Sequence, residues 1–235
     1  MNIIDWVVLG LIMLYVLNGV YRGFVPSLLN LGGFFVSWIA SFLSYPLLSQ
    51  KLAEIPLFSS LLFYIEGADR AGALFELTKL PVSALTPDQL QSVMSTASLP
   101  PPYDSAIYTN VSTQALADQG VVTLGEYFDA TIFNVMINIL SILIIFVILR
   151  TVFTLLTNAF SFSTPLPQLR RFDFLLGGAT GFLRGFFSMY LIFSVIPIIL
   201  VLLPISEVTK LINDSALCKV FYTSSILLRF VSGVI

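Results

Sequence analysis

The sequence predicts an all-α, multi-pass membrane protein with about four transmembrane helices. Hydrophobic residues make up 57% of its 235 residues and charged residues only 10%, whereas soluble domains carry about 25% charged residues. Four apolar runs are long enough, at about 1.5 Å per helical residue, to cross a hydrocarbon core about 30 Å thick. A polar, acidic block separates the second run from the third, and an amphipathic tail follows the fourth. We expect the block to be an inserted helical segment, extracytoplasmic or at the membrane surface.

The first two runs predict a transmembrane hairpin within residues 1–51. The spans are residues 3–20 and 24–48, and the turn of only three residues makes them antiparallel neighbours. Asp5 lies in the first helical turn, where the helix dipole and the water interface favour a carboxylate. The first run has no basic flank and no small-residue cleavage site, so we interpret it as a retained span rather than a signal peptide.

Residues 52–129 form the acidic inserted loop, which contains nine of the chain's 13 acidic residues. Residues 56–80 have the pattern of an amphipathic helical segment on or near the membrane, and we expect the helices of the loop to be short. Thr86-Pro87-Asp88 predicts a helix start, with threonine as the cap, proline at the first position and an acid in the first turn. The three consecutive prolines at 100–102 predict a stiff break between two short helices.

The second transmembrane unit is predicted at residues 130–204, and its first span covers residues 131–149. Asn134 and Asn138 lie on one face of this span, four residues apart. Such amides either hydrogen-bond to a neighbouring helix or form a polar strip along a pathway, and the sequence favours the first interpretation.

The fourth run, residues 173–203, is too long for one upright helix and too short for two. Arg184 lies about a third of the way along it. Either the helix is long and tilted with Arg184 inside the bundle, or residues 174–183 form a re-entrant half-helix before a span at 185–203. The second arrangement is slightly favoured. The tail, residues 205–235, is predicted to be interfacial, with a helix over its apolar end.

A short pattern, Gly-x-x-Arg-Gly-Phe, occurs at residues 19–24 and again at 181–186. An arginine at the edge of an apolar run either anchors the helix at the interface or marks a functional site. Glycines at a spacing of four form a stripe on which another helix can lie, and nearby acids are candidate partners of the arginines. The candidate functional residues are Asp5, Gly19, Arg22, Gly23, Asp173, Gly177, Gly181, Arg184 and Gly185.

Several classes of activity are excluded or disfavoured by composition. The sequence has no histidine and one cysteine, so we expect no histidine-ligated metal site, no disulfide framework, no cofactor and no catalytic cluster. A net charge of −2 disfavours nucleic-acid binding. The expected partners are the lipid bilayer and either a second copy of the chain or another membrane protein, packed through the glycine faces.

The distribution of arginines predicts the orientation. The turn that contains Arg22 and the loop at 150–171 carry the arginines, so the positive-inside rule places both in the cytoplasm. The N-terminus, the acidic loop and the tail would then lie outside.

Several motifs together resemble the bacterial colicin V production protein family. They are Asp5 with Arg22-Gly23-Phe24, the run from Asp173 to Gly178 followed by Gly181 and Arg184-Gly185, and residues 212–217 of the tail. The resemblance implies a four-span protein of the cytoplasmic (inner) membrane that supports toxin production or export and envelope homeostasis. The family has no established reaction, so the expected role is non-enzymatic. The alternative is a small channel or transporter subunit with Arg184 lining the path.

Overall fold

The computed structural model describes residues 2–60, 62, 65, 67–159, 172–202, 206–223 and 225–235. The chain divides into two compact units, which are described separately. Unit 1 comprises residues 1–45, 142–194 and 206–225, and unit 2 comprises residues 46–141, 195–205 and 226–235.

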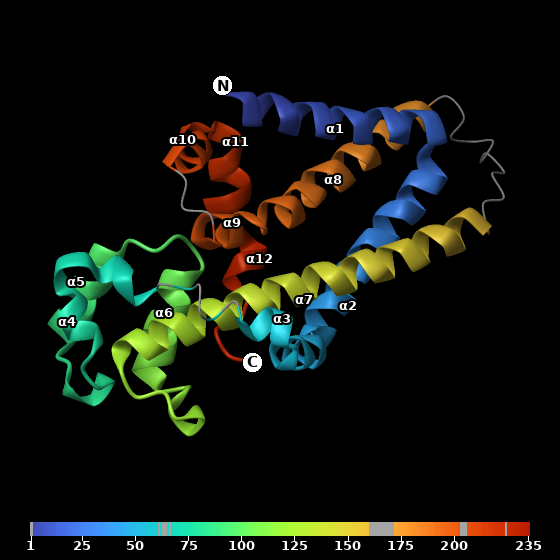
Figure 1. Ribbon diagram of the computed structural model, residues 1–235. Coiled ribbons are helices and arrows are strands. Elements are labelled where there is room, and N and C mark those ends of the chain that lie inside the picture. The colour runs from blue at the N-terminus through green and yellow to red at the C-terminus, as the bar shows by residue number, and fades with distance from the viewer. Residues whose placement is uncertain are drawn as a thin grey trace. The chain divides into compact units, whose positions relative to one another are not determined.

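The predicted all-α, multi-pass class is confirmed. The described residues contain no strand beyond an isolated bridge between Pro81 and Thr123. Four helices are long and apolar enough to cross a membrane (Figure 1). The helices are α1 (Ile3–Arg22), α2 (Phe24–Glu54), α3 (Pro56–Ser59), η2 (Ala68–Leu74), α4 (Phe75–Thr78), η3 (Val82–Ala84), α5 (Pro87–Ala97), α6 (Tyr103–Thr113), η4 (Ala117–Gln119), α7 (Leu124–Ala159), α8 (Asp173–Phe193), α9 (Ile196–Leu202), α10 (Ser206–Asp214), α11 (Ala216–Cys218), the π-helical η6 (Lys219–Thr223) and α12 (Ile226–Arg229).

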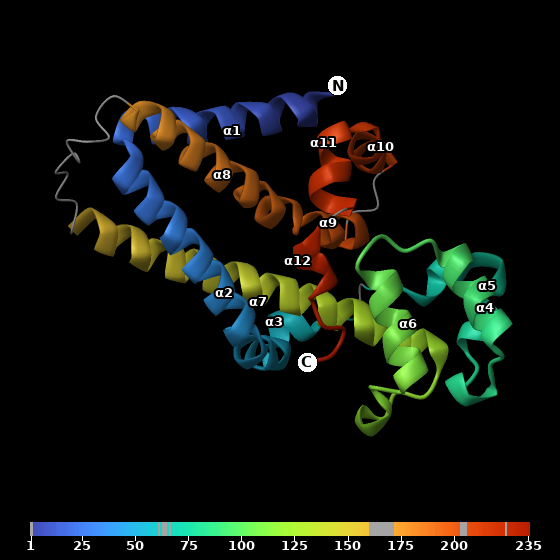
Figure 2. The ribbon, with the colours of Figure 1, turned by 180° about the vertical axis from the view of Figure 1, so that it is seen from behind.

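Unit 1 is built on the pair α1 and α8, which lie side by side and run in opposite directions (Figures 1 and 2). A capping box starts α1: the Asn2 side chain accepts from the backbone N–H groups of Ile4 and Asp5, and the Asp5 carboxylate accepts from the N–H of Asn2 at 2.8 Å. Large apolar side chains remain exposed along α1, including Trp6 at 65% and Leu14 at 63%. In a membrane protein, such a surface is compatible with lipid.

The fourth run differs from the favoured prediction. Helix α8 is continuous from Asp173 to Phe193 and passes through Arg184 without a break, so the proposed half-helix over residues 174–183 is wrong. The interruption lies instead between α8 and α9. Pro197 explains it, because proline has no N–H to donate and its ring clashes with the carbonyl four residues earlier, which belongs to Phe193.

The other spans are longer than predicted. Helix α2 runs to Glu54 rather than residue 48, and α7 covers 124–159 rather than 131–149. The early start of α7 follows from a capping box: Thr123 Oγ1 accepts from the N–H of Glu126, whose carboxylate accepts from the N–H groups of Val122 and Thr123 at 2.8 and 2.9 Å.

Unit 2 contains the acidic loop, whose second half matches the prediction. Thr86 caps α5 in a capping box with Gln89, Pro87 occupies the first turn, and the prolines at 100–102 separate α5 from α6. The helical segment predicted over residues 56–80 is divided into short helices. That stretch contains the short α3, η2 and α4, and Gly72 breaks the helical geometry with φ of 53°.

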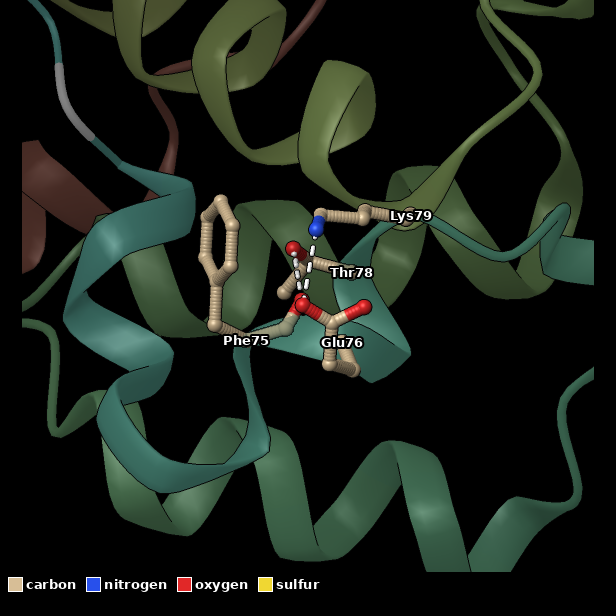
Figure 3. Close-up of polar contacts among 4 residues, drawn as sticks. All are labelled: Phe75, Glu76, Thr78 and Lys79. Atoms are coloured by element: carbon tan, nitrogen blue, oxygen red, sulfur yellow. Dashed lines mark hydrogen bonds and ion pairs between the residues drawn. The ribbon is translucent and has the colours of Figure 1, made fainter.

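The last turn of α4 is closed by its own side chains (Figure 3). Thr78 Oγ1 donates to the carbonyl of Phe75 at 2.7 Å, and Lys79 Nζ lies 2.7 Å from Glu76 Oε1 and 5.0 Å from the centre of the Phe75 ring. Because both charged groups are exposed, this pair contributes little to stability.

Candidate functional site

The glycines of the two repeated motifs meet in one backbone-to-backbone contact between α1 and α8. A Cβ atom added to Gly19 would collide with the carbonyl oxygen of Gly177 and lie 3.0 Å from the Cα of Gly181. A Cβ on Gly177 would collide with the carbonyl oxygen of Gly19, and one on Gly181 with that of Tyr15. The two main chains approach so closely that any side chain at these positions must push the helices apart.

The remaining motif glycines accommodate single side chains. A Cβ on Gly185 would lie 2.9 Å from the Cβ of Tyr15, so this glycine makes room for the tyrosine. Gly23 adopts φ of 80° in the turn between α1 and α2, and its open face is filled by the carboxylate of Asp173. A residue with a side chain would be strained there by its backbone as well as by the contact.

Asp173 pairs with none of the arginines that the structure describes, contrary to expectation. Its Oδ1 accepts a hydrogen bond of 2.9 Å from the N–H of Phe24, the first residue of α2. The carboxylate therefore caps α2 from the start of another helix, 149 positions away in the sequence. A carboxylate at a helix N-terminus satisfies a free N–H group and complements the helix dipole.

Asp5 is also used as a cap and not as an arginine partner. Its side chain is fully buried, and its Oδ1 accepts from the Ser215 hydroxyl at 2.6 Å and from the N–H of Leu217 at 3.0 Å. These bonds hold the start of α11 against the first turn of α1. Within the part of the chain that the structure describes, the only ion pair is Lys79–Glu76.

Arg22 and Arg184 have different surroundings. Arg22 is exposed in the last turn of α1. Arg184 turns inward: its guanidinium carbon lies 4.7 Å from the centre of the Tyr15 ring, a cation–π contact, and its Nε is buried without a hydrogen-bond partner. The two arginines of the repeat are therefore not equivalent.

Arg150 is a site residue that the sequence reasoning missed, because it was assigned to the end of a span. The structure places it inside α7, where Nη1 donates to the carbonyl of Asn30 at 3.2 Å and Nη2 to its Oδ1 at 3.0 Å. The available signal was the apolar sequence that continues for several residues on both sides of Arg150.

Arg150 and Arg184 line the same pocket in unit 1, which has a volume of about 200 Å³. Four helices, α1, α2, α7 and α8, contribute to its wall. None of the described lining residues is acidic. They are Tyr15, Phe34, Phe146, Arg150, Arg184, Ser188, Leu191 and Ile192.

The asparagines of α7 bind the end of the chain in unit 2. Asn134 Nδ2 donates to the carbonyl of Gly233 at 3.1 Å, and Asn138 Nδ2 donates to those of Ser232 and Val234 at 2.9 and 3.1 Å. Asn110 adds a bond of 2.8 Å to Gly233. The favoured interpretation was right that these amides make structural hydrogen bonds, but the partner is a non-helical segment and not a helix.

The chain end therefore differs from the interfacial helix predicted for residues 220–235. Only the short η6 and α12 are helical there, and residues 230–235 contain no helix. Val231 is buried, as is Gly233, whose carbonyl receives two of the asparagine bonds. Glycine is needed at this position, because an added Cβ would lie 2.8 Å from Asn110 Nδ2.

Cys218 lies at the end of α11, near the Asp5 cap. Its side chain is buried, its N–H donates to the Ser215 hydroxyl at 3.0 Å, and burial, together with the charge of Asp5, raises the pKa of its thiol to about 11. The thiol is thus protonated at neutral pH, and the protonated form is not the nucleophile.

Comparison with known proteins identifies the family of this chain. The profile of the Colicin V production protein family matches residues 4–75 and 111–226. No curated protein and no solved structure matches the chain. The unmatched residues 76–110 include all of α5, whereas the nine predicted site residues and Arg150 fall within the matched ranges. The match covers most of the sequence and agrees with four helices able to cross a membrane, so this membrane protein belongs to the Colicin V production protein family.

Proposed function

We propose that the protein is a non-enzymatic factor of the bacterial cytoplasmic (inner) membrane that supports production or export of a colicin V-like toxin and envelope homeostasis. The observation that carries the proposal is the family match over residues 4–75 and 111–226. The structural roles of the acidic side chains support the proposal that the factor is not an enzyme. Asp5 and Asp173, the two acids among the candidate residues, are engaged in helix caps rather than directed toward a substrate.

The proposed orientation places the turn around Arg22 in the cytoplasm, because an exposed arginine at a helix end is retained on that side of the membrane. The proposed partner is a second copy of the chain or another membrane protein. The large apolar side chains left exposed on α1, such as Trp6 and Leu14, offer surface either to lipid or to such a partner.

A deletion strain that carries a colicin V-type toxin operon tests the proposal. Toxin activity is measured separately in the culture medium and in washed cells, and the strain is complemented with the wild type, Gly181→Leu or Gly10→Leu. The proposal predicts that the deletion lowers toxin in the medium and that Gly10→Leu restores it, since no atom lies within 4 Å of a Cβ at that position. Gly181→Leu should fail. Wild-type toxin levels in both fractions of the deletion strain would overturn the proposal.

A small channel or transporter with Arg184 lining the path is the second candidate. The pocket that contains Arg150 and Arg184 between four helices favours it. The test is anion flux into proteoliposomes, with wild type and Arg184→Ala at equal incorporation. Flux that disappears in Arg184→Ala would support transport. A wild-type protein that gives no flux under chloride or phosphate gradients would exclude it for these anions.

A further inference from the structure

We propose that the pocket of unit 1 is a binding site for a phosphate group, held between the guanidinium groups of Arg150 and Arg184. The site would take a phosphate ester of a lipid head group or a free phosphate ion, since both present the same tetrahedral anion. This inference concerns ligand binding alone and does not depend on a role in toxin production.

The charge of the pocket is the first reason. Two guanidinium groups line it, no lining residue is acidic, and neither arginine makes an ion pair within the described part of the chain. Removing cations from water without a counter-charge is costly, and like charges near one another add to that cost. An anion between the two arginines would remove both penalties.

The unused hydrogen-bond donors are the second reason. A guanidinium has five N–H donors in a planar fork that matches the oxygens of phosphate. Arg150 uses two of its donors on Asn30, and that contact fixes the orientation of the group. The Nε of Arg184 is buried and has no acceptor. A buried donor without an acceptor raises the free energy of the folded protein, and an oxyanion that reaches the donor would relieve this cost.

The position of Arg184 is the third reason, because it argues against a simple interfacial anchor. Gly185 lets Tyr15 approach α8, and the ring of Tyr15 then lies 4.7 Å from the guanidinium carbon. The side chain is thus held over an aromatic ring beside the pocket. By making room for Tyr15, Gly185 allows the contact that holds Arg184 beside the pocket, where it can meet a ligand.

The apolar part of the wall indicates what else the ligand carries. Phe34, Phe146, Leu191 and Ile192 complete the pocket beside the arginines. Such a wall favours a phosphate with an apolar substituent over the bare ion. We therefore expect an anionic phospholipid to bind more tightly than inorganic phosphate.

Equilibrium binding to the full-length protein in a non-ionic detergent tests the proposal with three probes. They are short-chain phosphatidic acid, inorganic phosphate, and diacylglycerol of the same chain length, which lacks only the phosphate. The variants are Arg150→Gln, Arg184→Gln, their double mutant and Arg184→Lys. Lys210→Gln is the control, because it removes one exposed positive charge from the same unit.

We expect phosphatidic acid to bind the wild type and Lys210→Gln equally, and each single arginine variant at least tenfold more weakly. Arg184→Lys, which keeps the charge but loses the fork, should be intermediate. Binding of inorganic phosphate with the same dependence on both arginines would identify a free anion as a ligand, and binding of phosphatidic acid alone would identify a lipid. Equal binding of diacylglycerol and phosphatidic acid would overturn the proposal, as would unchanged binding in a double mutant that elutes as a single folded species. Absence of binding by every phosphate probe would also overturn it.

Discussion

Units 1 and 2 satisfy the hydrogen bonds of their backbone groups in different ways. In unit 1, α1 and α8 satisfy their own backbone groups, and glycines let the two main chains touch directly. In unit 2, the segment at residues 232–234 has no helical bonds, so asparagine side chains donate to its carbonyls. A backbone carbonyl away from water needs a donor, and a helix provides its own whereas an extended segment does not.

The difference predicts different weaknesses. At Gly19, Gly177 and Gly181 the α1–α8 contact is made by main-chain atoms, which cannot rotate aside, so these positions should be sensitive to added volume. The amide contacts in unit 2 should tolerate volume better and be sensitive to the loss of a donor. Four experiments test this contrast, from the largest expected effect to the smallest.

Gly181→Leu should have the largest effect, a loss of about 3 kcal/mol or more in stability. The new side chain would meet the backbone of Tyr15 and Gly19, which cannot rotate away, and overpacking of even flexible cores costs about 1–3 kcal/mol. Thermal unfolding and elution volume in detergent are the measurements. Gly32→Leu is the matched control, since it lies within α2 and has no atom within 4 Å of an added Cβ.

Gly181→Leu should also disrupt the protein more than Gly120→Leu. Gly120 is open as well, but its φ of 80° makes any side chain strained there, so Gly32 is the cleaner comparison. Equal elution profiles for the Gly181 and Gly32 variants would refute the close-contact role of the glycine stripe.

Asn138→Leu should cost about 2 kcal/mol, because it leaves the carbonyls of Ser232 and Val234 without this donor at little change in volume. Carboxypeptidase digestion followed by intact-mass measurement reports the change locally, since the freed chain end should be trimmed faster. Asn213→Leu, an exposed position, should be trimmed at the wild-type rate. Identical trimming in both variants would show that the amide does not hold the chain end.

Asp173→Ala should cost about 1 kcal/mol, the usual effect of removing a helix cap. Asp173→Asn should lose less, because its side-chain oxygen still accepts from the N–H of Phe24 while the charge near the helix dipole is gone. Chemical unfolding in detergent measures both. Asp214→Ala, at an exposed position in the same unit, serves as the comparison, and an Asp173 variant no less stable than it would disprove the cap.

Cys218 provides the smallest and most local test. The thiol pKa of about 11 lies above the ordinary value of 9.0, so between these values the folded state retains a proton that the unfolded state loses. This group's contribution to stability should therefore be constant below pH 9 and decline as the pH rises toward 11.

Maleimide labelling of Cys218 at pH 7.5 should be at least a hundredfold slower than labelling of the double variant Cys218→Ser/Tyr21→Cys, since Tyr21 is 90% exposed. Comparable rates would show that α11 does not shield the thiol.

Local patterns in the sequence predicted the features that depend on neighbouring residues. The hairpin turn at Gly23, the cap at Thr86 and the glycine stripe around Gly181 all follow from spacing and residue type. The half-helix was wrong because the repeat was given more weight than the absence of a helix breaker near Arg184. The actual break is next to Pro197, and proline is the residue type expected to interrupt a helix.

The partners of the polar residues were not predictable in this way. Asp173 binds the N–H of Phe24, Arg150 binds Asn30, and Asn138 binds the carbonyls of the chain end. Each pair is separated by more than 90 positions, and no periodicity connects its members. The sequence shows that such groups need partners, and only the fold shows which ones they have.

The long-range caps have a consequence for biogenesis. A membrane protein emerges from the ribosome N-terminus first, so α2 is made well before Asp173, which caps it, and Asp5 is made well before α11, which Asp5 caps. The N–H of Phe24 gains its acceptor only when Asp173 has been synthesised. The carboxylate of Asp5 gains the N–H of Leu217 as a donor only 212 positions later. The polar contacts of the α1–α2 hairpin are thus complete only after α8 and α11 have been made.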